Sequence, residues 1–245
     1  MLRVAVAQTT PIAGDIAGNL RQHLALAEAA ARARVRLLAF PELSLTGYEL
    51  PRARALAFTL DDPRLEPLRE LARTRRLTLV VGAPVRLGPR LHIGALIVAP
   101  DGALDVYTKR HLGAFTASAA PDGVVPPPEP SVFAPGDRDP LIELAGHRAA
   151  VAICADLGRP SHAEAAAARG ADLYLACAFV IPADHERERE RLRERATRHG
   201  MLVAFANFGG PSGGLPSAGA SEIWSPAGAL LGRLGEAGAG LVIAE

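Results

Sequence analysis

Short apolar runs alternate with amphipathic segments along most of the chain. A short apolar run bounded by turn residues is typical of a buried strand, and apolar residues spaced three and four apart are typical of one face of a helix. Strands therefore alternate with helices over much of the sequence, while turn signals inside residues 91–108 and 217–244 predict hairpins. This mixture predicts an α/β (α+β) fold of mixed sheets with helices outside, rather than a purely parallel doubly wound sheet.

The expected elements cover most of the 245 residues. Strands are expected at residues 3–9, 35–40, 77–83, 91–99, 104–108, 147–154, 172–177, 201–207, 217–224, 229–234 and 241–244. Asp15 is the expected N-cap of a first helix, and further helices are expected at residues 63–75, 161–169 and 184–199. Residues 112–130 have five prolines and no apolar period, which predicts a long loop. Because no repeat or linker interrupts the pattern, we expect one domain over residues 1–245.

Composition excludes several classes of function. A formal net charge of +1 creates no global basic field, so we expect neither a nucleic acid nor a membrane surface as a partner. The opening residues carry no apolar signal-peptide core, and the longest apolar run, residues 171–183, is too short to span a bilayer. Two cysteines, Cys154 and Cys177, are too few for a disulfide scaffold. We therefore expect a cytoplasmic protein.

Lys109 is the only lysine among 27 lysine and arginine residues. Such a bias indicates a genome that favours arginine codons, so a lysine kept in this background indicates a position where arginine would not serve. Arginine is planar and always charged, whereas lysine is a compact point charge that can approach another group closely. Chance survival on the surface is the alternative, and we favour a functional role.

Three residue types suited to catalysis follow three expected strands. Glu42 follows residues 35–40, Lys109 follows residues 104–108, and Cys154 ends its strand. In sheets covered by helices, functional sites collect at the carboxyl ends of strands. We therefore expect these side chains to meet at one site.

The three residue types together predict acyl transfer through a thioester. A thiolate such as that of Cys154 is a nucleophile, and a carboxylate such as that of Glu42 can accept the thiol proton and later activate water. The ammonium of Lys109 can stabilise the oxyanion that forms when a carbonyl is attacked. The seven histidines show no metal-ligand spacing. We expect neither a metal nor a cofactor.

The segments that carry these residues resemble a known family. FPELSLTGYE, YTKRHL and ICADLGRP, in this order and spacing, are similar to the three signature segments of the carbon–nitrogen hydrolase (nitrilase) superfamily. VAVAQTTPIAGDIAGNL near the start and VFAPGD at residues 132–137 also resemble segments of that family. The resemblance extends from about residue 2 to about residue 234 and leans toward the amide-hydrolysing branches.

The resemblance implies a fold, an activity and site residues. The fold would be a four-layer αββα sandwich, assembled as a homodimer or higher homo-oligomer. The activity would be hydrolysis of non-peptide C–N bonds in small linear amides or carbamoyl compounds, with a small-molecule amide as the partner. Glu42, Lys109 and Cys154 match the family's catalytic residues, and Glu129 matches a second glutamate that lies between the lysine and cysteine segments.

Other residues are expected to shape the site. Ala155 stands where the family usually has an aromatic or acidic residue, so we expect its backbone N–H to face the oxyanion and its small side chain to widen the substrate pocket. We expect three aromatic side chains to line the substrate-binding wall: Tyr48, Phe115 and Phe179.

Several neighbouring residues have structural rather than catalytic expectations. Asp156 and Arg159 are expected to fix the turn after the nucleophile, and His111 is expected to stabilise its loop. Cys177 is expected in the core or wall, without a disulfide to Cys154. Charged residues 184–199 alternate glutamate with arginine, which predicts a solvated or interface helix rather than a nucleic-acid site.

Two other functions compete with the amidohydrolase. A catalytically inactive binding or scaffold protein of the same fold would explain Ala155 and the proline-rich loop at residues 112–130, which looks rearranged relative to the family, but not the retained Lys109. Acyl transfer to an amine in place of water would use the same residues. Ammonia release separates a hydrolase from a scaffold, and the product formed with an added amine separates a hydrolase from a transferase.

Overall fold

The strands form two sheets that pack against each other. The computed structural model describes residues 2–120 and 122–245, and over these residues each sheet has six strands. The first sheet, ordered β12-β1-β2-β3-β4-β5, contains β1 (Val4–Gln8), β2 (Leu37–Ala39), β3 (Thr78–Leu87), β4 (Arg90–Val98), β5 (Leu104–Thr108) and β12 (Gly240–Ala244). The second, ordered β11-β10-β9-β8-β7-β6, contains β6 (Ile142–Leu144), β7 (His147–Ile153), β8 (Leu173–Cys177), β9 (Leu202–Ala206), β10 (Glu222–Trp224) and β11 (Leu230–Arg233).

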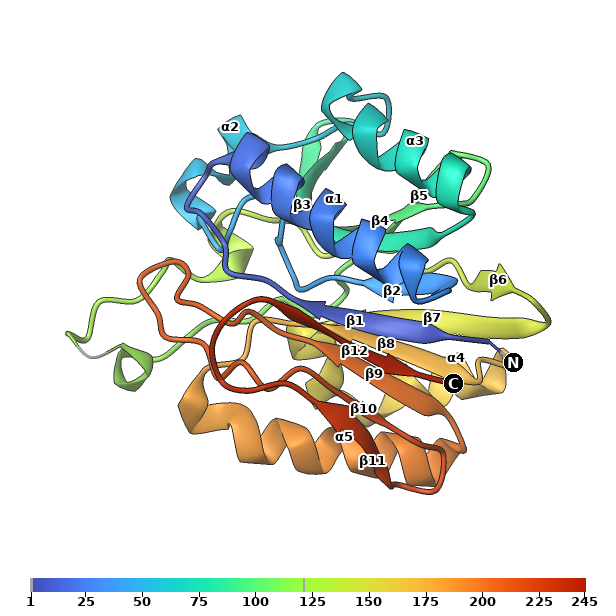
Figure 1. Cartoon of the computed structure of the whole chain (residues 1–245). Helices are drawn as coiled ribbons and strands as arrows, with labels where there is room; N and C mark the ends of the chain where they lie inside the picture. The colour runs from blue at the N-terminus through green and yellow to red at the C-terminus, as the bar shows by residue number, and fades with distance from the viewer. Residues whose placement is uncertain (1, 121) are drawn as a thin grey trace.

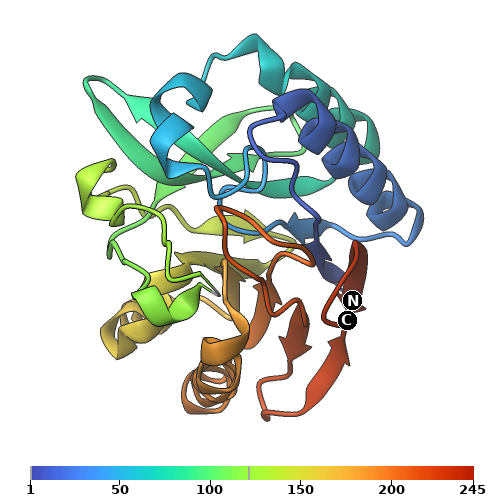
Figure 2. The ribbon, with the colours of Figure 1, turned by 90° about the vertical axis from the view of Figure 1, so that its left-hand side faces the viewer.

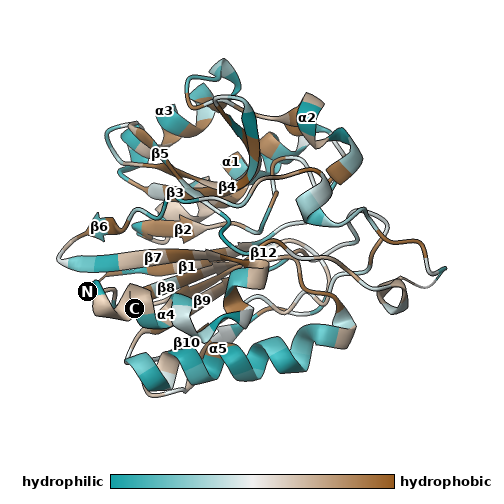
Figure 3. Cartoon of the chain, turned by 180° about the vertical axis from the view of Figure 1, so that it is seen from behind, coloured by the Kyte–Doolittle hydropathy of each residue, from teal (hydrophilic) through white to brown (hydrophobic). Residues whose placement is uncertain are grey.

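Helices cover the outer face of each sheet, so the layers run helix, sheet, sheet, helix (Figure 1). On the first sheet lie α1 (Ile16–Arg32) and α3 (Glu66–Arg75), with the short α2 (Ala53–Leu56) nearby, and on the second lie α4 (Pro160–Ala168) and α5 (His185–His199). Figure 3 shows apolar strands inside and hydrophilic helix surfaces outside. The expected α/β sandwich of mixed sheets is confirmed.

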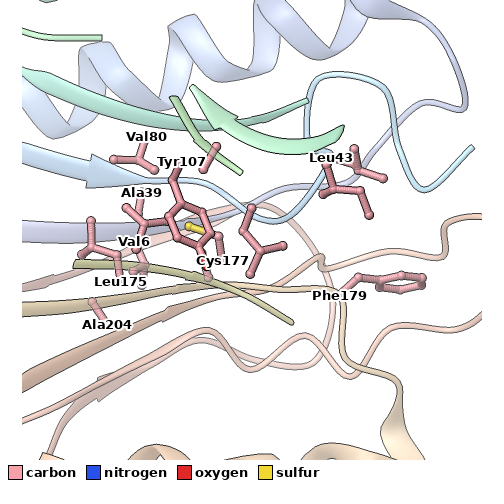
Figure 4. Packing of buried hydrophobic residues seen from close by; sticks show 14 of the residues in the cluster. Val6, Ala39, Leu43, Val80, Tyr107, Leu175, Cys177, Phe179 and Ala204 are labelled. Carbon is pink, nitrogen blue, oxygen red and sulfur yellow. The ribbon is translucent and has the colours of Figure 1, made fainter. Parts of the chain in front are cut away.

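Three apolar clusters hold these layers together. The largest lies between the two sheets and includes Val6, Ala39, Leu175 and Cys177 (Figure 4). A second cluster joins the first sheet to α1 and α3, and a third joins the second sheet to α4 and α5. Burial of apolar surface on both faces of each sheet explains why the strands read as apolar runs rather than as alternating patterns.

Strand direction brings the ends of several strands to one edge of the molecule. β1, β2 and β3 are parallel, and β5 runs the same way because β4 is antiparallel to both of its neighbours. In the second sheet β7, β8 and β9 are parallel. Figure 2 shows the loops that follow these strands facing the viewer. The carboxyl ends of β2, β5, β7 and β8 thus lie on the same side.

The N-terminal half follows the predicted pattern, with one extended strand. Asp15 caps α1, since its side chain accepts a hydrogen bond from the N–H of Gly18 at 2.9 Å. β3 was expected to end at residue 83 but continues through Pro84 to Leu87. Proline is tolerated there because β2 has already ended, so no neighbouring strand needs the missing N–H.

The C-terminal half departs further from expectation. The strand expected at residues 217–224 is regular only over β10, because Gly219 and Ala220 both have positive φ. β12 does not continue the hairpin of β10 and β11; it crosses to the first sheet and pairs antiparallel with β1. β6 and α2 were not predicted, since each is too short to show a period.

Candidate active site

Glu42 lies in a tight turn that follows β2 and packs directly on β3. The N–H of Leu45 donates to the carbonyl oxygen of Gly82, and the N–H of Gly82 donates to the hydroxyl of Ser44. A side chain at Gly82 would place its Cβ 2.2 Å from the carbonyl oxygen of Pro41. Only glycine therefore lets the turn approach this closely, and the approach buries the Glu42 carboxylate completely.

Lys109 joins two buried carboxylates. Its Nζ donates to Oε1 of Glu42 and to Oε1 of Glu129, both at 2.7 Å. Glu129 also accepts hydrogen bonds from the hydroxyl of Tyr48 and from the N–H of Gly113, each at 2.7 Å. All three charged side chains are at most 2 % exposed. Such a group needs mutual pairing, because unpaired charges are costly away from water.

Burial and neighbouring charges shift the pKa values of these groups. Burial raises the pKa of Glu42 to about 7; the ammonium of Lys109 opposes this shift and the charge of Glu129 adds to it. Burial alone would lower the pKa of Lys109, but nearby negative charges, chiefly that of Glu42, raise it above its ordinary value. Lys109 is therefore protonated at neutral pH, whereas Glu42 changes between its protonated and ionised forms near pH 7. Its Oε2 is buried without a hydrogen-bond partner among the described residues.

Cys154 begins a 3₁₀ turn, η5 (Cys154–Gly158), directly after β7. Its φ of 45° lies in the left-handed region, which is strained for a residue with a side chain. Its thiol lies 3.7 Å from the carbonyl oxygen of Phe179. Burial and the charge of Glu42 raise the pKa of this thiol well above its ordinary value, with Lys109 opposing. The thiol is thus neutral at rest and needs a base to become a nucleophile.

A cavity of about 300 Å³ is lined by Cys154, Lys109 and Glu129. Glu42 lies behind the cavity wall, fully buried against Lys109. The cavity is also lined by every residue expected in the substrate-binding wall, namely Tyr48, Phe115, Ala155 and Phe179. The three aromatic rings form one cluster with centroids 5.2–5.6 Å apart. The structure therefore brings all eight expected site residues to one place.

The cavity rim contains charged residues that the sequence did not place there. Asp184, Arg187, Glu188 and Arg191 come from the start of α5 and the residue before it. Arg187 pairs with Asp184 at 2.7 Å and Arg191 with Glu188 at 2.6 Å. The alternating charges were interpreted as a solvated or interface helix. Ion pairs at i,i+3 spacing occur both on a solvated helix and on a helix that borders a cavity. The sequence pattern therefore does not distinguish the two, and only the tertiary position of α5 shows that these residues lie on the cavity rim.

The structural expectations near Cys154 are partly confirmed. Asp156 fixes the turn, because its carboxylate accepts hydrogen bonds from the backbone N–H groups of Ile153 and His111. Arg159 does not: its exposed side chain has no hydrogen bond to the described residues and lies on the cavity rim. Cys177 is buried in the cluster between the sheets as a free thiol, as expected.

Residues 2–120 and 122–245 also bear on metal binding and on membrane insertion. No cluster of three or more His, Cys, Asp or Glu side chains in this part of the chain could hold a metal ion. Within the same residues, no helix combines the length and the apolar character needed to cross a membrane.

Comparison with known proteins identifies the family. A family model described as carbon-nitrogen hydrolase matches residues 3–245. The chain therefore belongs to the carbon–nitrogen hydrolase family. It is an amidase-type enzyme of the nitrilase superfamily, as its sequence neighbours indicate. The chain is 32% identical over 240 residues to a protein of Pseudomonas protegens named "Hydrolase in pqqF 5'region", and 96% of this chain aligns with 79% of that protein. It is 29% identical to an (R)-stereoselective amidase of a Pseudomonas species, over 96% of this chain and 81% of that protein.

Solved structures of an amidase from Nesterenkonia sp. AN1 share the fold. One mutant of that enzyme, with acrylamide added to its active-site cysteine, has a TM-score of 0.87 and 30% identity, over 100% of this chain and 93% of the other. Another mutant of that enzyme is in complex with butyramide, with a TM-score of 0.85 and 30% identity, over 99% of this chain and 89% of the other.

Proposed function

We propose that this enzyme hydrolyses small linear amides or carbamoyl compounds through a thioester on Cys154, with Glu42 as general base and Lys109 as the oxyanion partner. One observation supports this assignment above all: the single lysine of the chain lies buried, 2.7 Å from each of two carboxylates, in the wall of the cavity that Cys154 enters.

Acylation begins with proton transfer from the Cys154 thiol to the carboxylate of Glu42. The sulfur attacks the amide carbon, and the negative charge moves to the carbonyl oxygen. That oxyanion faces the Lys109 ammonium and the N–H of Ala155, which lies in the first turn of η5, where N–H groups have no partner within the turn. The C–N bond then breaks, Glu42 returns its proton to the nitrogen, and ammonia or an amine leaves.

Deacylation uses the same carboxylate a second time. Glu42 removes a proton from water, and the resulting hydroxide attacks the thioester carbon. The C–S bond breaks, and the sulfur recovers its proton from Glu42 as the acid product leaves. A base whose pKa lies near 7 suits both directions of proton transfer at neutral pH.

Glu129 acts on Lys109 rather than on the substrate carbon in this proposal. Its Oε1 fixes one proton of the ammonium, and the Tyr48 hydroxyl and Gly113 N–H fix Glu129 in turn. The ammonium is thereby aimed by two carboxylates, which leaves its remaining proton for the developing oxyanion. The aromatic wall and the volume of about 300 Å³ favour a short substrate chain.

Ammonia release from a series of short amides tests the proposal. We expect turnover of at least one member, for example butyramide, and none with Cys154→Ala. Thioester chemistry also predicts an acyl-enzyme of the corresponding mass when the wild-type enzyme is quenched with acid during turnover, and none with Glu42→Gln, which lacks the base for acylation. If hydroxylamine diverts all product to hydroxamate while water gives none, the enzyme is a transferase. If no amide is cleaved and no acyl-enzyme forms, the proposal is wrong.

A further inference from the structure

A polar network that is buried except at His111 lies outside the residues assigned to catalysis. We call it the Asp156 network; its members are Tyr107, His111, Asp156, His162 and Tyr174. They come from β5 and the residues after it, from η5, from α4 and from β8. The donor–acceptor distances among these five residues are 2.7–2.9 Å, which are ordinary hydrogen-bond lengths.

Asp156 makes four hydrogen-bond contacts. Its Oδ2 accepts from the Tyr107 hydroxyl at 2.7 Å and from the Ile153 N–H at 3.1 Å. Its Oδ1 accepts from the N–H of His111 at 2.9 Å, and it lies 2.8 Å from the ring Nδ1 of His111, which donates to it when that nitrogen carries a proton. Together these four contacts fill the acceptor sites of one carboxylate.

The directions of the remaining bonds follow from this count. Tyr107 has one hydroxyl proton and gives it to Asp156, so His162 must donate to the Tyr107 oxygen through an Nε2–H, at 2.8 Å. A neutral His162 with its proton on Nε2 then accepts on Nδ1 from the hydroxyl of Tyr174, at 2.8 Å. The bonds therefore all point one way, from Tyr174 through His162 and Tyr107 to Asp156.

The surroundings agree with a neutral His162. Burial lowers the pKa of its ring below the ordinary value; Arg110 and His111 add to this shift, and Asp156 and Asp139 oppose it. Among the described residues, the ring of His162 makes hydrogen bonds only to the hydroxyls of Tyr107 and Tyr174.

Asp156 connects the two segments that carry the proposed catalytic pair. Tyr107 and His111 lie two residues before and two residues after Lys109. Ile153 is the residue before Cys154, and Asp156 itself is two residues after it. One carboxylate thus binds both flanks of the lysine and the flank of the strained cysteine turn.

We propose that the Asp156 network is a positioning device that holds Cys154, at its strained φ, in a fixed place relative to Lys109. It rests on the proposed function, because it assigns positioning residues to that same site. Its members touch neither substrate nor reacting atoms. His162 and Tyr174 act by fixing the proton of Tyr107 on Asp156, and Asp156 acts by holding the two flanks together.

Substitutions at His162 separate hydrogen bonding from space filling. Glutamine can still donate to Tyr107 and accept from Tyr174, whereas phenylalanine keeps the ring volume and loses both bonds. We expect His162→Gln to retain kcat within about threefold of the wild type and His162→Phe to lose about tenfold or more, with KM nearly unchanged in both. A residue that merely fills space predicts the reverse order.

The peripheral variant Tyr174→Phe keeps the ring and removes only the proton given to His162. We expect about a threefold loss of kcat and a similar loss in the rate at which iodoacetamide alkylates Cys154. Leu71→Ala, in the cluster between α3 and the first sheet, serves as a control that lowers the melting temperature without contacting the network. We expect it to leave both rates unchanged at a temperature where it stays folded.

Nitrogen NMR of ¹⁵N-histidine-labelled wild-type protein tests the bond directions without any substrate. We expect His162, assigned by its absence in His162→Gln, to be neutral with its proton on Nε2 between pH 6 and 8. A proton on Nδ1, a kcat of His162→Phe equal to or above that of His162→Gln, or equal losses in Leu71→Ala would overturn the inference. If no amide is hydrolysed at all, the proposed function fails, while alkylation and NMR still decide the network.

Discussion

Lys109 contacts both Glu42 and Glu129 through one small ammonium group, and this geometry explains why a chain rich in arginine has a lysine there. A guanidinium is larger and planar, and the position is completely buried between two carboxylates. A second nitrogen would have to displace Glu42 or occupy the place of the oxyanion. A positive charge alone is therefore not sufficient at position 109; the group that carries it must also be small.

Lys109→Arg is expected to lower kcat by about 100-fold or more, since a displacement of about 1 Å at a reacting centre can cost that much. Steady-state kinetics on the best short amide measure the loss, and circular dichroism confirms that the variant is folded. Arg110→Lys, which alters an exposed neighbour paired with Asp139, is the matched control and should retain activity. Comparable activity in the two variants would contradict the assigned role of Lys109.

The ionisation of Glu42 predicts the pH profile. Its pKa is raised to about 7, and only its ionised form can accept the thiol proton. Activity should therefore be lost as the pH falls through about 7, with kcat/KM dropping tenfold per pH unit well below that value. Lys109, whose pKa is raised, stays charged across this range. A profile that stays flat from pH 8 to pH 5 would exclude Glu42 as the base.

Much of the site could be predicted at the residue scale, because three residue types suited to one chemistry each follow an apolar run. Glu42, Lys109 and Cys154 could be found this way without any distance. The Asp156 network could not, because His162 and Tyr174 lie on other elements and their contacts depend on how α4 packs against β8. Asp156 and His111 were expected to have structural roles, but the hydrogen bonds that join Asp156 to the residues on both sides of Lys109 are visible only in three dimensions.

At the scale of elements, the contact between the turn after β2 and strand β3 determines where Glu42 lies. Gly82 lies in the middle of a strand, where glycine ordinarily weakens a sheet. Here it allows residues 41–44 to pack on the strand and to exchange backbone hydrogen bonds with it. The sequence predicted a strand ending near this glycine, since Gly82 and Pro84 commonly mark a break; the structure instead uses both inside β3.

Gly82→Ala is expected to push the Glu42 turn outward, because the new Cβ would lie 2.2 Å from the Pro41 oxygen and 2.4 Å from the Leu43 nitrogen. Backbone on both sides leaves little room to relax, so we expect a loss of stability of roughly 1–3 kcal/mol and at least a tenfold loss of kcat. Gly235→Ala is the control, since nothing lies within 4 Å of its added Cβ. Thermal unfolding and kinetics of both variants provide the comparison.

At the scale of the whole molecule, the two sheets meet through one shared apolar cluster that contains Cys177. This thiol is 1 % exposed, and burial raises its pKa to about 12. Cys154 lines the cavity instead. The reactivity of Cys154 therefore reports on the site, and the reactivity of Cys177 reports on separation of the two sheets.

Cys177 should react with iodoacetamide only when the molecule opens globally. For a typical stability of 5–15 kcal/mol, its alkylation should be at least about 1,000-fold slower than that of an exposed thiol. Mass spectrometry after graded exposure to urea measures both cysteines in one sample. Modification of Cys177 in native buffer at a rate close to that of Cys154 would show that the sheets separate far more readily than this packing implies.

Self-association as a homodimer or higher homo-oligomer stays a prediction at this scale. Sedimentation velocity over a range of protein concentrations measures it directly. A monomer at every concentration would contradict the expectation drawn from the family resemblance, without affecting the site, all of whose expected residues come from one chain.

The pairing of β12 with β1 has a consequence for biosynthesis. Val4 lies opposite Ala244, so β1 has to wait during translation for a partner strand made about 240 residues later. Until then, β1 has an open edge on the ribosome, which is a hazard for non-native pairing. The first sheet can be completed only after residues 240–244 have left the exit tunnel. Nascent chains of this enzyme should therefore need shielding by chaperones until synthesis has passed that point.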